Sequence, residues 1–192
     1  MADYFADGDD VLENKLGITD QQKLKEVEQD IVANKTACLL GEASTIFDLD
    51  FLLHVHEVLF EDIYSFAGKI RTVDIAKPEA SVPFAYAKFI QSETERIFSE
   101  LTPKKYLVGL DKRAFIQEIA NLAAELNALH PFREGNGRAI RMFLILLADH
   151  AGFLLDYSQA SSKELIEADK LAFEGDSRLL LDMYEKVTIK TS

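Results

Sequence analysis

The chain has 192 residues, 48% of them hydrophobic and 28% charged, which is enough for one domain with a buried core and too few for two comfortable domains. Its formal net charge of −12 argues against a general phosphate-neutralising face, so we expect no direct contact with nucleic acid. The longest apolar run, 142–148, is too short to span a bilayer, and the acidic N-terminus lacks the order of a signal peptide. With a single cysteine, Cys38, and hence no internal disulfide, we expect a cytoplasmic protein without a membrane partner.

Most of the chain has apolar residues at helical spacing, so we predict an all-α fold in one compact domain, 1–192, with residues 1–18 as an N-terminal arm. The segment 138–150 is apolar on nearly every side, which indicates a helix buried at the centre. Narrower apolar stripes lie in 24–31, 52–63, 89–101, 115–129 and 179–187.

Capping residues mark three predicted helix starts. Thr19 and Gln22 form a capping box ahead of the first stripe, and Asp48 is placed to cap the second helix. Ser161 and Glu164 form another capping box, which predicts a further helix after residue 161.

One segment breaks the helical pattern. Residues 73–75 alternate between apolar and polar, 77–81 have the composition of a turn, and 82–84 follow it. This order predicts a short β-hairpin over about 71–84 on an otherwise helical protein. Because a hairpin exposes strand edges, the segment is either a structural loop or a docking surface for an extended peptide.

The segment 130–141 reads His-Pro-Phe-Arg-Glu-Gly-Asn-Gly-Arg-Ala-Ile-Arg and predicts a tight loop between two helices. Pro131 disfavours helical geometry at His130, so the first helix ends there. Gly135 and Gly137 allow a sharp turn and a close approach to a ligand. The second helix begins near Gly137, so its free amide groups face the loop.

Several side chains of this segment suit phosphate chemistry. Arg138 and Arg141, one helical turn apart, complete a polyphosphate cradle with the free amides. Glu134 can supply a hard oxygen ligand for Mg²⁺, and His130 can take a proton from an attacking hydroxyl. Each residue alone is commonly structural, but a base, a carboxylate, two glycines and two arginines within twelve positions favour a functional site. No serine or cysteine nucleophile accompanies them, so direct transfer to an external acceptor is favoured.

At these residues the chain resembles the Fic family, whose signature is His-Pro-Phe-x-(Asp/Glu)-Gly-Asn-Gly-Arg-x-x-Arg, with every specified position filled. The segment 63–75 resembles the family's approach to its flap hairpin, and the layout is similar to the compact Fic toxins of bacterial toxin–antitoxin modules. The resemblance implies a helical domain that uses ATP with Mg²⁺. It also implies that AMP is transferred to a Ser, Thr or Tyr hydroxyl of a target protein.

The family resemblance also assigns roles to single residues. It makes His130 the catalytic base and Glu134 the magnesium ligand. It places Lys77 and Phe84 on a flap that docks the target. It implies that the loop holds the α-phosphate and the arginines hold the β- and γ-phosphates, which gives an ATP site of Gly135, Asn136, Gly137, Arg138 and Arg141.

The family resemblance also bears on regulation. Many Fic proteins have an inhibitory helix with the pattern Ser/Thr-x-x-x-Glu-Gly/Asn. Its glutamate pairs with the second arginine of the signature, which corresponds to Arg141 here. Here Glu13, Glu134 and Glu174 precede Gly or Asn, but none has Ser or Thr four positions earlier. We therefore expect no segment of this chain to face Arg141, and a separate small antitoxin to supply the glutamate. A degenerate internal inhibitor around Glu174 is the alternative.

Two other functions stay open on the sequence. The same fold could transfer another phosphate-containing group, either phosphocholine or a phosphoryl group. Alternatively, the chain could be a catalytically silent module that binds a partner through its hairpin, although both His130 and Glu134 are present. His54 and His56 point to different faces of a predicted helix, so we expect no shared metal site there.

Overall fold

The structure is a computed structural model that describes residues 11–42, 44–75 and 83–191. No helix in these ranges is long and apolar enough to cross a membrane. The described α-helices are α1 (Gln21–Leu39), α2 (Leu49–Phe60), α3 (Ile90–Ser99), α4 (Lys112–Leu129), α5 (Asn136–His150), α6 (Ser162–Phe173) and α7 (Arg178–Val187). Short 3₁₀ turns cover Ala87–Phe89, Lys105–Leu107 and Tyr157–Gln159, and two strands, β1 (Phe153–Leu155) and β2 (Thr188–Lys190), pair antiparallel.

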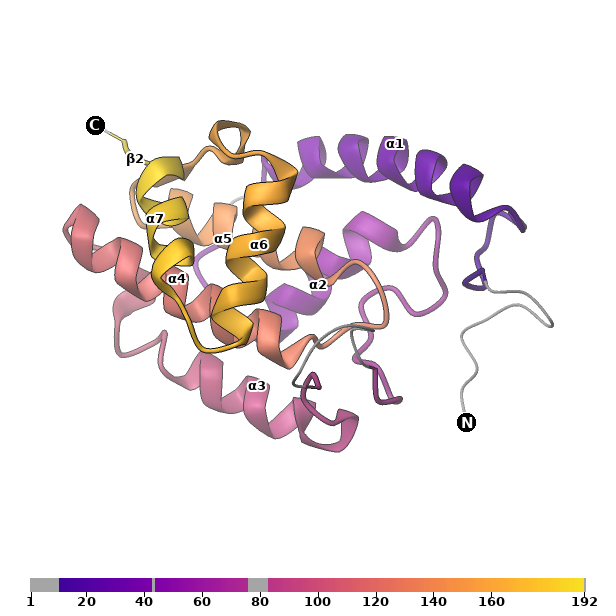
Figure 1. The fold of residues 1–192 in the computed structure, drawn as a ribbon, viewed down its shortest axis with the longest axis horizontal. Helices are drawn as coiled ribbons and strands as arrows, with labels where there is room; N and C mark the ends of the chain where they lie inside the picture. Colours follow the sequence, from indigo (N-terminus) through magenta and orange to yellow (C-terminus); the bar gives the residue numbers. More distant parts are fainter. Residues whose placement is uncertain (1–10, 43, 76–82, 192) are drawn as a thin grey trace.

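The predicted all-α fold is confirmed, with α5 at its centre (Figure 1). Helix α5 packs against α2 on one side and α4 on the other, while α6 and α7 pack against each other and against α4. Helix α1 lies along α2 at one edge of the molecule (Figure 1). Most side chains of α5 are buried, including Phe143 and Leu147 at 0% exposure, as expected for a helix that is apolar all round.

Two of the three predicted caps are confirmed. The Asp48 side chain accepts from the Phe51 amide, and Ser161 with Glu164 makes both bonds of a capping box. The predicted cap at Thr19 is wrong by one residue, because Asp20 has the extended backbone and its carboxylate accepts from Lys23 N. An N-cap side chain reaches the amide three residues on, so Asp20 fits a helix that begins at Gln21.

The described flanks of the predicted hairpin, 71–75 and 83–86, carry no strand assignment, and its turn with Lys77 lies outside the described residues. Both flanks bond to the end of α4 and the loop after it. Arg71 N donates to the Pro131 carbonyl at 2.9 Å, and Ala85 N donates to the Ala128 carbonyl at 3.2 Å. The segment is therefore fixed to the predicted active-site loop at both of its ends.

A buried guanidinium reinforces this attachment. The Arg71 residue is 1% exposed. Its Nε donates to the His130 carbonyl at 2.8 Å, and its two Nη atoms donate to the carbonyls of Val73, Ala85 and Leu129 at 2.8, 2.5 and 3.3 Å. The last carbonyls of a helix have no partners within it, so this side chain satisfies the end of α4 while it joins the two flanks.

We expect Arg71→Lys to lower the free energy of unfolding by about 2–4 kcal/mol, because an ammonium group cannot reach carbonyls in several directions and leaves buried acceptors unpaired. Chemical denaturation measures this loss. Arg113→Lys, an exposed arginine in α4, is the matched control and should change stability by less than about 0.5 kcal/mol. Equal stability of the two variants would contradict the structural role of Arg71.

Candidate active site

His130 ends α4 in a left-handed conformation, with φ of 49° and ψ of 63°. Pro131 follows it and has no N–H, so the Asn127 carbonyl lacks the donor that would continue the helix. The His130 imidazole fills that place, with Nδ1 3.3 Å from the Asn127 carbonyl oxygen. Because a carbonyl only accepts, Nδ1 carries the proton, and in the neutral imidazole Nε2 then has the lone pair that a general base requires.

The Phe84 ring stacks on the imidazole of His130, with centroids 3.9 Å apart and planes at 12°. Phe84 also contacts Phe173 of α6, at 5.3 Å between centroids. The residue that the sequence predicts on a target-docking flap therefore lies directly against the predicted base. It fixes the plane of the imidazole by stacking on one of its faces.

The loop between α4 and α5 is closed by Asn136. Its Oδ1 accepts from Phe132 N and its Nδ2 donates to the Phe132 carbonyl, each at 2.8 Å. Asn136 is 3% exposed. Its side chain therefore shapes the loop from inside, with both its oxygen and its nitrogen bonded to the backbone of Phe132.

Both motif glycines are required by their surroundings. Gly135 caps α5 with φ of 77°, and an added Cβ would lie 2.4 Å from the Phe60 ring. A Cβ on Gly137 would lie 3.2 Å from each Nη of Arg141, so the guanidinium lies across this position. No side chain caps α5, which leaves its first amides and the Arg141 fork side by side at one helix terminus.

The other arginine is held from two sides. Arg138 Nη1 lies 2.5 Å from Glu28 of α1, and its Nη2 lies 3.5 Å from Glu134. Glu28 is buried at 7% exposure and also accepts from the Tyr64 hydroxyl, whose pKa is raised by burial and by this bond. Sequence patterns do not indicate the Glu28 contact, because it joins residues of α1 and α5 that are far apart in the chain.

The Glu134 carboxylate is 45% exposed in its side chain and accepts from Gly135 N at 2.8 Å. It lies beside Arg138 at the amino end of α5, where phosphates would bind. No group of three His, Cys, Asp or Glu able to hold a metal occurs in the described part of the chain. One carboxylate next to a phosphate site is the donor set that Mg²⁺ uses when the substrate phosphates supply the remaining oxygens.

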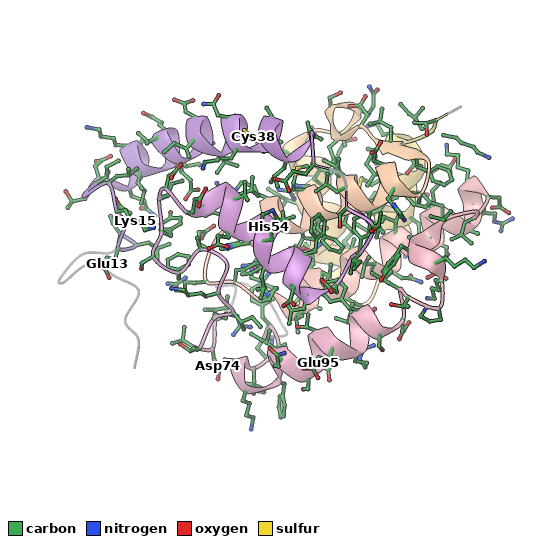
Figure 2. All side chains as sticks on the ribbon, turned by 180° about the vertical axis from the view of Figure 1, so that it is seen from behind. Glu13, Lys15, Cys38, His54, Asp74 and Glu95 are labelled. Atoms are coloured by element: carbon green, nitrogen blue, oxygen red, sulfur yellow. The ribbon has the colours of Figure 1, made fainter. Side chains whose placement is uncertain are left out.

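His56, which the sequence excluded as a metal ligand, supports this loop. It is fully buried, stacks on Phe132 at 3.8 Å, and its Nε2 lies 3.0 Å from the Glu134 carbonyl. Gly68 N donates to its Nδ1 at 2.9 Å, so Nε2 carries the proton and donates. His54 instead lies on the outer face seen in Figure 2, 3.0 Å from Glu42.

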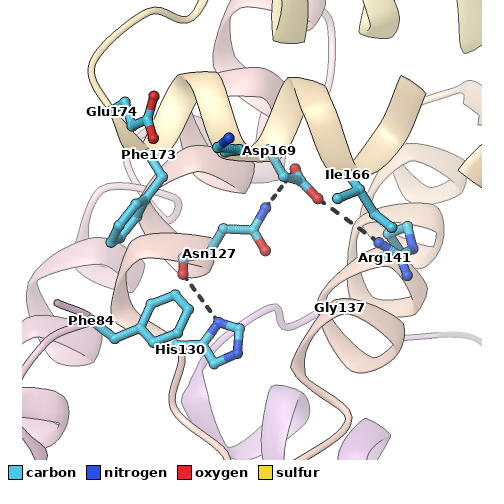
Figure 3. A pocket seen from close by; sticks show the side chains of 10 residues that line it. Phe84, Asn127, His130, Gly137, Arg141, Ile166, Asp169, Phe173 and Glu174 are labelled. Atoms are coloured by element: carbon cyan, nitrogen blue, oxygen red, sulfur yellow. Dashed lines mark hydrogen bonds and ion pairs between the residues drawn. The ribbon is translucent and has the colours of Figure 1, made fainter. Parts of the chain in front are cut away.

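A cavity of about 440 Å³ contains the predicted base (Figure 3). His130, Gly137 and Arg141 line it from the loop and α5, while Phe173 and Asp169 line it from α6. A neighbouring groove of about 740 Å³ runs between α1 and α6. It contains the remaining charged residues predicted for the site, Glu134 and Arg138, and shares Arg141 with the first cavity.

The structure thus brings the predicted ATP-binding residues to one helix terminus, while Lys77 lies outside the described residues. It differs from the sequence expectation at Arg141. The expectation was that no segment of this chain faces that side chain, but Asp169 of α6 lies 4.0 Å from Nη1. No motif marks Asp169, because its partners come from α4 and α5.

Comparison with known proteins gives one family. The sequence pattern of the Fic/DOC family matches residues 46–148. Protein adenylyltransferase VbhT of Bartonella schoenbuchensis is 40% identical over 172 residues, which cover 88% of this chain and 35% of the relative. Probable protein adenylyltransferase Fic of Escherichia coli is 34% identical over 185 residues, which cover 96% of this chain and 90% of the relative.

A solved structure matches over nearly the whole chain. BepC, a VirB-translocated effector protein of Bartonella tribocorum with bound AMPPNP, superposes with a TM-score of 0.95 at 29% identity. The match covers 98% of this chain and 97% of that one.

We expect His56 to make stability depend on pH. Burial, with a smaller effect of Arg138, lowers its pKa from 6.5 to about 4 in the folded state. The neutral form is therefore favoured by folding, and its full contribution is present above about pH 6.5 and lost as the pH falls to about 4. The loss amounts to roughly 3 kcal/mol.

Denaturation of the wild type and of His56→Gln at a series of pH values measures this contribution. The stability difference between them should shrink as the pH falls from about 6.5 to 4. His54→Gln, at an exposed histidine of the same helix, controls for the loss of an imidazole. A difference that stays constant over this range would contradict the assignment.

Proposed function

The chain belongs to the Fic/DOC family, and we infer from that membership and from its site that it is a protein adenylyltransferase. It moves AMP from ATP to a Ser, Thr or Tyr hydroxyl of a target protein. The observation that carries this conclusion is the His130 imidazole, whose Nδ1 lies 3.3 Å from the Asn127 carbonyl oxygen, in the cavity that Arg141 also lines. A base beside a polyphosphate cradle suits transfer of a phosphate-linked group to a hydroxyl.

In the proposed reaction, His130 Nε2 takes the proton of the target hydroxyl while its oxygen attacks the α-phosphorus. A new P–O bond forms to the target, the bond from the α-phosphorus to its bridging oxygen breaks, and pyrophosphate leaves. The amides at the start of α5, made accessible by Gly135 and Gly137, hold the charge that develops on the α-phosphate. Arg138 and Arg141 hold the β- and γ-phosphates.

Mg²⁺ fits the donor set on the loop. Glu134 would hold the ion together with the phosphate oxygens, and the ion would neutralise phosphate charge. The Glu134 carboxylate is oriented for this role by Gly135 N, and its main chain is fixed by His56. Both ATP and Mg²⁺ are cytoplasmic, and we place the activity in that compartment.

The segment 71–84, with Lys77 and Phe84, would dock the target. Its attachment through Arg71 to the His130 carbonyl supports this, because a peptide held by the segment would lie beside the base. Phe84 covers one face of the imidazole, so an approaching hydroxyl would reach the ring edge at Nε2.

A separate antitoxin would supply the inhibitory glutamate. The groove between α1 and α6 supports this proposal, because Arg133, Arg138 and Arg141 all line it. A carboxylate carried on a short helix would fit a groove of about 740 Å³ with this charge. Occupying Arg141, it would displace the γ-phosphate from its productive position.

We expect His130→Ala to abolish AMP transfer, with a loss of ~10²–10⁴ in rate, and to leave ATP binding nearly unchanged. The reason is that His130 faces the acceptor while α5 holds the nucleotide. Transfer is measured with α-labelled ATP, Mg²⁺ and cell lysate, and binding by calorimetry. His54→Ala, remote from the cavity, is the control, and substantial transfer by His130→Ala would show that another group is the base.

We further expect this chain, produced alone in bacteria, to slow growth, because no antitoxin is then present. His130→Ala at equal protein level should restore growth, whereas His54→Ala should not. Labelling of a target band in the same cells links toxicity to transfer. Normal growth with abundant wild-type protein and no labelled target would count against inhibition in trans.

A further inference from the structure

Asp169 on α6 lies between two elements of the active site (Figure 3). Its Oδ1 accepts from Asn127 Nδ2 of α4 at 2.8 Å, and its Oδ2 lies 4.0 Å from Nη1 of Arg141 on α5. The side chain is half-buried, at 30% exposure. One carboxylate of α6 therefore contacts both helices that the active-site loop connects.

Arg141 lies where the proposed function places a ligand of the terminal phosphates. Its guanidinium lies across Gly137, at the amino end of α5. The contact with Asp169 is long and involves a single Nη atom, so it sets the direction of the side chain without covering the fork. Arg141 also lines both the 440 Å³ cavity and the neighbouring groove.

The carboxylate is itself held in place. Asn127 is fixed within α4, and its carbonyl already accepts from His130 Nδ1, so its amide presents one donor to Asp169 from a rigid support. Behind the pair lie Tyr157 and Tyr184, whose hydroxyls are 3.1 Å apart. Burial raises the pKa of both phenols, so they stay neutral. Asp169 and Arg141 are then the charged residues among those that line this small pocket.

We propose that Asp169 is a positioning residue for nucleotide binding, which holds Arg141 over the amino end of α5 and is oriented by Asn127. The proposal rests on the proposed function, since Arg141 is there the ligand of the terminal phosphates. An unrestrained arginine side chain has several free torsions, and ordering them on binding weakens affinity. Asp169 removes this cost before ATP arrives.

The test compares Asp169→Asn with the wild type. Asparagine keeps the shape and can still accept from Asn127, but it lacks the charge that holds Arg141. ATP should bind roughly fivefold to tenfold more weakly by calorimetry, and KM for ATP should rise by the same factor. The value of kcat at saturating ATP, and its pH profile, should stay within about twofold because His130 is untouched.

Glu167→Gln is the matched control, because it removes an equal charge from an exposed site on the same helix. It should leave ATP affinity unchanged, which separates positioning from the general field of the acidic chain. Asn127→Ala is a second variant that leaves Asp169 and Arg141 in place. It should weaken ATP binding by roughly twofold to threefold through loss of the support for Asp169.

A double-mutant cycle with Arg141→Ala decides the mechanism. If Asp169 acts through Arg141, Asp169→Asn should have almost no effect on ATP affinity in the Arg141→Ala background. An equal loss of ATP affinity in both backgrounds would overturn the proposal. Tighter ATP binding by Asp169→Asn would also overturn it, because the carboxylate would then compete with the phosphate for Arg141. Binding is measured without a target, so absence of AMP transfer in the wild type would refute the proposed function while the cycle still tests Asp169.

Discussion

The last carbonyl groups of α4 have no donors within the helix, and because they are buried they need hydrogen-bond donors from elsewhere in the protein. The buried Arg71 guanidinium supplies these donors. It binds the carbonyls of Leu129 and His130 together with those of Val73 and Ala85. A buried arginine has donors in a fixed planar fork, so these carbonyls must converge on it. Together with Pro131, which follows the last turn of α4, this one side chain fixes the turn at His130 and joins the described flanks of the segment to the loop.

His56 holds the same loop from its other side. It donates to the Glu134 carbonyl and stacks on Phe132, whose backbone is in turn closed by Asn136. The loop therefore obtains its shape from buried groups that bind its backbone, and its outward-facing amides are positioned before any ligand binds. Donors that need no reorganisation stabilise developing charge more effectively than mobile ones, so in the proposed reaction the buried supports would contribute to catalysis.

Sequence periodicity predicted the helices, and the caps at Asp48 and Ser161 followed from residue types that favour the start of a helix. Local spacing also located the loop and the start of α5, because proline and glycine act on their own backbone. It could not identify His56, Arg71 or Asp169 as part of the site, because their partners are remote in the chain. The strands β1 and β2 have three residues each and pair across 35 positions or so, too short for an alternating pattern to reveal them.

Arg138 and Arg141 share a spacing but not an environment. Arg138 is bound between Glu28, which is buried and also bonded to Tyr64, and Glu134. An incoming carboxylate would have to break a partly buried ion pair to engage it, and leaving Glu28 unpaired is costly. Arg141 has a single long contact in α6 and faces both cavities. If a separate partner supplies a glutamate as proposed, that carboxylate would break a weaker contact at Arg141 than at Arg138, because the Asp169 pair is longer than the Glu28 pair.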